Sequence, residues 1–446
     1  MSSILYALAN ILFQILAPVG VGTNLARYQL CFALLSGRFL SSRGALVPAL
    51  AATGLSDDAV RRSVAALAYG KWNLADLVSA WQQCVRREGR FVPQRHGGFR
   101  PVAVDLVGFF RPRLQGAVGK HYTSQANKAL PALVFGMVAE VGSVDKTRLP
   151  LLRTLVRQKG EESESALQKR VLQASARTLK GDEILIVDAG FGMEELLMHP
   201  KAAFLARLDQ NVTARRNFLA PYKGSGRHAL YGEIVRPLAR TYGGKTIAAT
   251  PPDKVVRWKS GRHTVRALVF ENLVAQEAMP GAATFGILVI LDPRYAKPLV
   301  VGTNRALSAC DAWRLYAKRW PVEQMPLAAK QMPIAAKQML GCARAFVFSA
   351  ESRWRLPELA MLAGNVLAYV AACHQPIATG FWDRCARPTP GRLRRVLGRL
   401  NFSELPLLAG QVRKKASPTA HLPKGVVAHR RHKAVPKPQP SQLKAD

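Results

Sequence analysis

Three aspartates that accompany short apolar runs are the residues of this sequence best suited to catalysis. Asp105 lies in Val-Ala-Val-Asp-Leu, Asp188 follows Ile-Leu-Ile-Val, and Asp292 ends another apolar run. Acids are scarce, with 28 Asp and Glu against 64 Lys and Arg, and a carboxylate at the end of a buried strand needs a partner. Asp292 precedes Pro293 and is explained as a turn former. Asp105 and Asp188 are the candidates for chemistry.

Asp105 and Asp188 face each other if their strands are neighbours in one sheet. Two adjacent carboxylates repel each other, but hard divalent cations that bridge their oxygens make the arrangement favourable. Magnesium is the cellular cation that binds both carboxylates and phosphates. A third carboxylate is needed to complete such a site, and Glu323, in a helix expected to begin near Ala312, is the best candidate.

Four residues around Glu323 share one face of that expected helix. Tyr316, Arg319, Glu323 and Lys330 follow one another at steps of three, four and seven residues, which places a carboxylate and two cations side by side. This spacing resembles the YREK signature of insertion-sequence DDE transposases. The Arg-Trp-Pro-Val-Glu core, the Val-Asp-Ala-Gly-Phe run at Asp188 and the β-rich segment before Glu323 are similar to the same family.

The resemblance, over roughly residues 100 to 370, implies both a fold and a function. It makes Asp105, Asp188 and Glu323 the catalytic acids and metal ligands of a ribonuclease H-like domain that holds two Mg²⁺ ions, with Mn²⁺ as an alternative. Tyr316, Arg319 and Lys330 would contact transposon-end DNA. The implied activity is metal-dependent strand cleavage and strand transfer at insertion-sequence ends, performed by a homodimer in the synaptic complex.

A tandem duplication interrupts this pattern. Residues 324–330, Gln-Met-Pro-Leu-Ala-Ala-Lys, recur almost unchanged at 331–337, so Lys337 competes with Lys330 as the lysine of the signature. Seven residues turn a helix by about 700° and displace it by about 10 Å, which nearly preserves the face but not its position. Two alternatives therefore stay open: a transposase-derived DNA-binding protein without catalysis, and a metal-dependent nuclease that cleaves without joining.

The charge points to a polyanionic partner. The formal net charge of the 446 residues is +36, and phosphate neutralisation provides affinity for such a chain. Double-stranded DNA is the first candidate partner, and an anionic membrane the second. Residues 411–446 hold nine Lys and Arg, one acid and several prolines, which predicts a flexible basic tail.

The patterns predict an α/β chain, with a helical DNA-binding domain before a ribonuclease H-like catalytic domain that carries a β-rich insertion. The expected segments are a helical region (1–92), the first catalytic part (93–215), the insertion (216–294), the second catalytic part with the catalytic helix (295–400), and the basic tail.

Within the first region, Gly54 and Ser56 separate two helices. Val60, Val64 and Leu67 turn Arg61, Arg62 and Ser63 toward other faces, from which they could reach DNA.

Strand patterns surround the candidate acids. Residues 101–106 and 183–187 read as strands, 130–141 as one or two, and 149–180 as a helix, so a strand, a long helix and a strand predict parallel pairing. Residues 255–270 and 286–302 each resemble a hairpin. Asp182 and Glu183 are expected to be surface or cap residues.

Neither long uncharged run predicts a membrane span. Polar or helix-breaking residues interrupt both Ile4 to Gly22 and Leu359 to Phe381, which favours buried helices. The six cysteines show no metal-ligand spacing and no disulfide framework. We therefore expect a cytoplasmic, nucleoid-associated protein.

Overall fold

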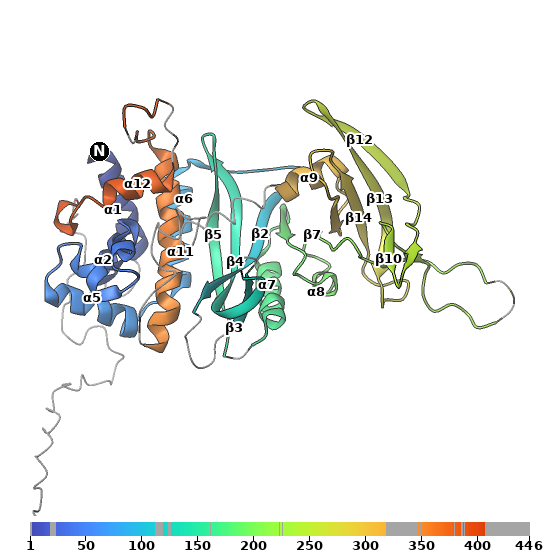
Figure 1. Cartoon of the computed structure of the whole chain (residues 1–446), viewed down its shortest axis with the longest axis horizontal. Coiled ribbons are helices and arrows are strands. Elements are labelled where there is room, and N and C mark those ends of the chain that lie inside the picture. Colours follow the sequence, from blue (N-terminus) through green and yellow to red (C-terminus); the bar gives the residue numbers. More distant parts are fainter. Residues whose placement is uncertain are drawn as a thin grey trace, which may run out of the picture.

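The computed structural model is a mixed α/β fold (Figure 1). It describes residues 2–17, 24–111, 119–123, 126–160, 162–222, 224, 226–317, 347, 349–378, 380–384, 387 and 389–405. Helices gather at one end of a large sheet, and a β-rich extension lies at the other end. The α/β class predicted from the sequence is confirmed at this level.

The helical end of the fold is built from both halves of the chain. Its helices are α1 (Ser2–Leu16), α2 (Asn24–Leu35), α3 (Arg38–Ser41), α4 (Leu46–Ala51), α5 (Asp57–Tyr69), α6 (Leu74–Glu88), α11 (Ala350–Cys373) and α12 (Pro390–Leu397), with the short 3₁₀ helix η2 (Phe402–Glu404). The indole N–H of Trp81 on α6 donates to Asn365 of α11 at 2.7 Å, and both side chains are buried. The helical character predicted for the first 92 residues is therefore present, and α11 completes its core.

Residues 4–16 of the first uncharged run and 359–373 of the second lie in buried helices. α1 and α11 both contribute to the same apolar core. α11 is the one helix among the described residues whose length and composition would allow it to cross a membrane, and 89% of its most apolar window is buried inside the protein.

The sheet places the strands in the order β1-β4-β2-β6-β7-β15-β14-β13-β8-β9, with β3 and β5 also paired to β4 and β12 to β13. In the chain, α7 (Glu164–Thr178) and α8 (Met193–Leu197) connect strands, and α9 (Ala309–Ala317) follows β15. The strands are β1 (Phe91–Pro93), β2 (Arg100–Phe110), β3 (Gly119–Thr123), β4 (Lys128–Val144), β5 (Thr147–Arg157), β6 (Glu183–Val187), β7 (Phe204–Arg207), β8 (Ala214–Arg216), β9 (Ile234–Val235), β12 (Lys254–Ser260), β13 (His263–Ala275), β14 (Phe285–Leu291) and β15 (Leu299–Thr303). β10 (Arg240–Tyr242) and β11 (Lys245–Ile247) form a separate pair.

β2 and β6 are parallel neighbours, as the sequence predicted. β2 also pairs with β4 and β4 with β5, both antiparallel, while β7 continues the parallel direction beside β6. One sheet face packs on α7 and α8, and the other on α6, α11 and α9.

The helix predicted over 149–180 is wrong in its first half. Residues Thr147–Arg157 form β5, and the helix α7 starts only at Glu164. Leu149, Leu151 and Leu152 are all buried, and a strand buried on both faces shows a continuous apolar run that cannot be told from a helix. The overlooked signal is the two-residue turn Asp145-Lys146, in which Asp145 has a φ of 50°.

Other strand predictions agree with the structure. Residues 130–141 lie in one long strand, β4, so the two-strand alternative is wrong. β12 pairs with β13 and β14 with β15, both antiparallel, as the two predicted hairpins require. Gly261, with a φ of 63°, occupies the two-residue turn between Ser260 and His263. Ile234 and Val235 add the further short strand β9 to the β-rich segment.

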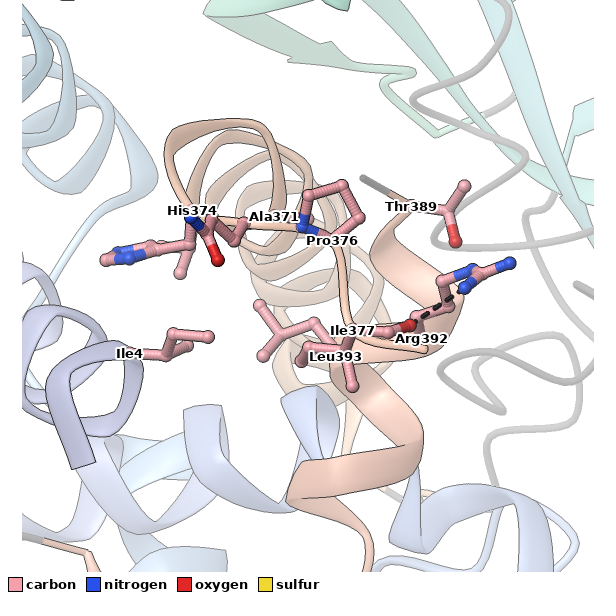
Figure 2. Close-up of a pocket in the computed structure, with 10 residues that line it drawn as sticks. Ile4, Ala371, His374, Pro376, Ile377, Thr389, Arg392 and Leu393 are labelled. Atoms are coloured by element: carbon pink, nitrogen blue, oxygen red, sulfur yellow. Dashed lines mark hydrogen bonds between the residues drawn. The ribbon is translucent and has the colours of Figure 1, made fainter. Parts of the chain in front are cut away.

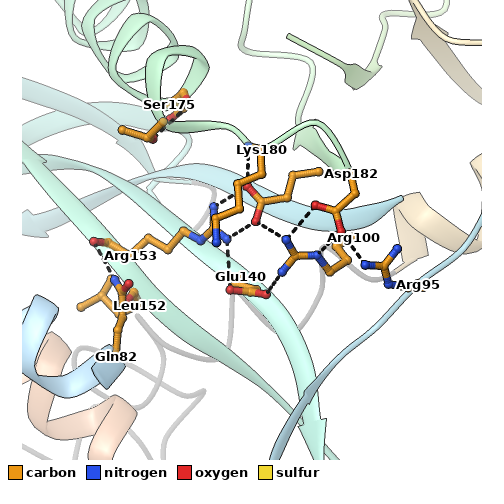
Figure 3. Close-up of polar contacts among 11 residues, drawn as sticks. Gln82, Arg95, Arg100, Glu140, Leu152, Arg153, Ser175, Lys180 and Asp182 are labelled. Atoms are coloured by element: carbon orange, nitrogen blue, oxygen red, sulfur yellow. Dashed lines mark hydrogen bonds and ion pairs between the residues drawn. The ribbon is translucent and has the colours of Figure 1, made fainter. Parts of the chain in front are cut away.

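A buried ion network holds the start of β6 against β2 (Figure 3). Glu140 on β4 accepts from Arg100 at 2.9 Å and from Arg153 at 3.0 Å. Glu183, almost completely buried, also accepts from Arg153 and forms an ion pair of 3.0 Å with Arg100. Asp182 accepts twice from Arg100 and once from Arg95. Glu183 is thus a buried ion-pair residue that also caps the Lys180 N–H, and its assignment to the surface is wrong.

Replacement of Glu183 by Gln should destabilise the fold by on the order of 3 kcal/mol, because it leaves Arg153 and Arg100 buried with one acid fewer. Urea unfolding at neutral pH measures the effect. Glu277→Gln, at an exposed carboxylate, is the matched control and should change the unfolding free energy by less than about 0.5 kcal/mol. Equal stability of the two variants would contradict the role given to the network.

The same network should make stability depend on pH. Burial opposes ionisation of Glu183, but the hydrogen bond from Arg153 and the nearby arginines lower its pKa overall, and the hydrogen bond from Arg100 lowers the pKa of Asp182. Since these pKa values are lower in the folded state, the stabilisation is present above the ordinary carboxyl pKa of about 4 and is lost as the pH falls further. The difference in unfolding free energy between the parent and Glu183→Gln should therefore narrow from pH 7 to pH 3. A difference in unfolding free energy that grows as the pH falls would contradict this prediction.

Candidate active site

Asp105 and Asp188 lie beside each other at neighbouring strands of the sheet. Ala103 of β2 is in register with Ile186 of β6, and the two aspartates each follow two residues later along these parallel strands. Because side chains alternate along a strand, both aspartates point to the face that carries Ala103 and Ile186. This is the face on which α9 packs. The condition stated from the sequence, that the two strands be neighbours in one sheet, is met.

Asp188 is contacted by the backbone, by α9 and by the end of β7. Its Oδ1 accepts from the Ala189 backbone N–H at 2.9 Å and from the Tyr316 hydroxyl of α9 at 3.2 Å, and it lies 3.5 Å from Nη1 of Arg207. The side chain of Asp188 is 34% exposed. The carboxylate is thus accessible at the end of β6 and fixed in direction by a helix and by the next strand.

Asp105 lies within β2, which continues to Phe110 beyond the end of β6. Its Oδ1 accepts from the Leu106 backbone N–H at 2.9 Å, and the residue is half-buried. Carboxylate oxygens are hard donors, and oxygen donors are the ligands that Mg²⁺ and Mn²⁺ prefer. The two aspartates therefore match a divalent cation in donor type.

The other predicted members of the site lie outside the described residues. These are Glu323, Arg319, Lys330 and the duplicated segment 324–337. Within the described ranges, no group of three or more His, Cys, Asp or Glu residues is arranged to hold a metal ion. The described part of the chain accordingly supplies two acids of the predicted triad, and the third stays a prediction.

A cavity of about 460 Å³ opens beside Asp188. Its lining includes Arg207 and Tyr316, both of which contact Asp188, together with Tyr295, Lys297 and Trp313. Two cations and three aromatic rings provide partners for anionic and planar groups. The cavity next to Asp188 therefore offers both cationic and aromatic side chains.

Arg207 was not recognised from the sequence. It ends β7, the parallel strand that follows β6 in the sheet, and points to the same face as Leu205. The available signal was its position near the end of the short apolar run 204–208, equivalent to that of Asp188 after the run before it. Arg207 is a cation, so the pattern of acids beside apolar runs that identified Asp105 and Asp188 does not include it.

Asp292 has the structural role predicted for it. It is buried and accepts from the Arg294 backbone N–H at 3.1 Å and from the Arg294 side chain at 2.9 and 2.6 Å. The side-chain hydrogen bond from Arg294 lowers the pKa of Asp292. The residue therefore stabilises the turn between β14 and β15.

The helix-turn-helix segment has mixed outcomes. Ser56 caps α5 by accepting from the Ala59 N–H at 3.4 Å, as predicted. Arg61 and Arg62 are exposed, and Arg61 forms an ion pair with Asp58. Ser63 is buried and donates to Gln29 at 2.9 Å, so its predicted exposure is wrong. DNA contact by Arg61 and Arg62 stays a prediction.

A second cavity, between α1, α11 and α12, is too small to be a ligand site (Figure 2). It encloses about 10 Å³, roughly the space of one water molecule. Arg392 at its edge donates to the Ile377 carbonyl at 2.8 Å and pairs with Asp383. This region therefore contributes helix packing.

No model of a known protein family matches the chain, and no curated protein matches it.

Replacement of Tyr316 by Phe should remove one hydrogen bond from Asp188 and lower the unfolding free energy by about 1 kcal/mol. The ring would remain packed against its buried neighbours on α9. Tyr242→Phe, at a hydroxyl on a 79% exposed residue, is the control and should be neutral in thermal unfolding. An equally neutral Tyr316→Phe would show that the contact with Asp188 contributes nothing.

Proposed function

We propose that this protein is a DDE-type DNA transposase that cuts and joins DNA at the ends of an insertion sequence. The observation that carries the proposal is that Asp105 lies on β2 and Asp188 directly follows its parallel neighbour β6, with Tyr316 of the expected YREK signature bonded to Asp188. This brings together residues that are 128 positions apart in the chain. If the match to the signature were accidental, there would be no reason for Tyr316 to contact Asp188.

We infer that the sheet belongs to a ribonuclease H-like catalytic domain. The antiparallel strands β2, β4 and β5, the crossover helix α7 and the parallel strands β6 and β7 support this fold. The β-rich segment between β8 and β14 follows these strands and precedes the segment that contains Glu323. The predicted division of residues 93–400 into two catalytic parts and one insertion is retained on this basis.

The proposed chemistry is displacement at a DNA phosphodiester. Asp105, Asp188 and Glu323 would hold two Mg²⁺ ions, or Mn²⁺, which when bound activate the attacking oxygen and stabilise the leaving oxygen. In cleavage, water adds to phosphorus, the bond to the 3′ oxygen breaks, and the proton passes to that oxygen. In joining, the released 3′ hydroxyl attacks a target phosphodiester and displaces another 3′ oxygen. Arg207 and Tyr316 orient Asp188 for both steps.

Charge supports DNA as the substrate. Arg207 and Lys297 line the cavity beside Asp188, and the whole chain carries a formal charge of +36. Arg61 and Arg62 in the helical region, Arg319 and Lys330 in the signature, and the basic tail would add contacts with phosphates. Two ends must be brought together for joining, so the proposed working form is a homodimer, in the cytoplasm and associated with the nucleoid.

A second function has its own supporting observation, the duplication at 324–337. Each copy carries a proline, Pro326 and Pro333, after Glu323, and proline removes a helical hydrogen bond. A Glu323 displaced from the two aspartates would leave a DNA-binding protein without catalysis. The first proposal is preferred because the sequence retains all three carboxylates of the predicted triad, Asp105, Asp188 and Glu323.

The test is a cleavage and joining assay on DNA that carries the repeats flanking the element. With Mg²⁺, the parent should give cleaved and joined products, whereas Asp188→Asn, Asp105→Asn and Glu323→Gln should each lose at least about 10³-fold in rate through loss of metal ligation. DNA binding should change less than about threefold. Glu277→Gln is the control for loss of an exposed acid.

Each result separates the candidate functions. Undiminished cleavage by an aspartate variant would reject the assignment, and cleavage without joining by the parent would favour a nuclease. Binding without products would favour the DNA-binding protein. In that case a variant that lacks residues 331–337 should regain Mg²⁺-dependent products.

A further inference from the structure

The β12–β13 hairpin carries unusual charges on its outer face. Arg257 of β12 and Arg266 of β13 are directly opposite each other in the antiparallel register, and both are exposed. Lys259, two residues along β12, points to the same face and is also exposed. Like charges placed opposite each other across two strands are destabilising, so the free protein gains nothing from this pair.

This outer face is opposite the candidate active site. The alternate residues of β13, Val265, Ala267 and Val269, are buried in the core cluster that contains α9. Arg266 lies between them in the strand and therefore points away from α9. Asp188 and Tyr316 belong to the α9 face. The cations on the hairpin thus form a surface separate from the acids.

Acids nearby do not neutralise the outer face. Glu271 pairs with Lys254, Asp253 with Arg216, and Asp292 with Arg294. Within the ranges that the structure describes, Arg257, Lys259 and Arg266 make no ion pair or side-chain hydrogen bond. Residues 214–275 contain twelve Lys and Arg but only three acids. Arg257, Lys259 and Arg266 all lie on the β12–β13 hairpin, which projects at the β-rich end of the sheet (Figure 1).

We propose that the outer-face cations, Arg257, Lys259 and Arg266, bind the phosphate backbone of a DNA segment other than the one at the carboxylates. The inference rests on the DNA-binding part of the proposed function. A phosphate between two opposed guanidinium groups converts their repulsion into attraction, and the paired strands hold them at a fixed spacing. These contacts read no bases and should be independent of sequence. One chain could then hold DNA on both faces of the same sheet.

The test compares two double variants of the full-length protein by DNA binding at several salt concentrations. Arg257→Gln with Arg266→Gln should weaken binding to a random-sequence duplex about tenfold at low salt and reduce the slope of log K against log salt by about 2. Lys146→Gln with Arg148→Gln, at exposed cations on the β4–β5 hairpin, is the matched control and should leave the slope nearly unchanged. Thermal unfolding without DNA should show no loss of stability for the first variant, because it removes a repulsion.

Several outcomes would overturn the inference. An equal loss in both double variants would assign the effect to overall charge. Unchanged binding combined with self-association of Arg257→Gln with Arg266→Gln would instead mean that the cations protect the unpaired edge of β12. Cleavage by Asp188→Asn is measured in parallel. If that variant still cleaves while the hairpin variant loses DNA affinity, the proposed catalytic function fails and the hairpin contact stands.

Discussion

The register between β2 and β6 is the constraint on which the candidate site depends. Arg100 and Glu183 are register partners, and the aspartates follow five residues later on each strand. A slip of one residue would turn one aspartate to the α7 face and separate the pair. Arg100, Arg153, Glu140 and Glu183 oppose such a slip because every alternative register leaves buried charges without partners. The ion network thus acts at a distance, through the rigid strands, on the geometry of the acids.

Much of this site was predictable because it depends on local patterns. Asp105 and Asp188 could be found because each accompanies a compact apolar run. The helix pattern between the two runs predicted parallel strands, and β2 and β6 are parallel neighbours. β5 was missed because both of its faces are buried, which removes the alternation that identifies a strand. Glu183 was misplaced because its partners, Arg100 and Arg153, come from two other strands, and sequence spacing carries no record of such contacts.

The β-rich extension is joined by backbone pairing to the part of the sheet that carries the candidate acids. β15 pairs with β7, so the sheet continues from the candidate acids into β14 and β13 without interruption. The extension is therefore connected to the rest of the sheet by strand pairing as well as by the chain itself. Its orientation relative to Asp188 is set by strand hydrogen bonds and by α9, whose Ala312 and Leu315 are buried against both parts. A surface on the hairpin is consequently held at a defined position relative to the acids.

The packing of α11 has a consequence for synthesis of the protein. α11 lies close to the end of the described chain, yet its Asn365 bonds to Trp81, its Arg355 to the Leu67 carbonyl and its Tyr369 to Glu88. The amino-terminal helices therefore leave the ribosome long before the segment that closes their apolar core. At about 5 to 20 residues per second, the nascent chain spends tens of seconds with that core incomplete. Helices that begin the polypeptide are thus among the last parts to reach their native packing.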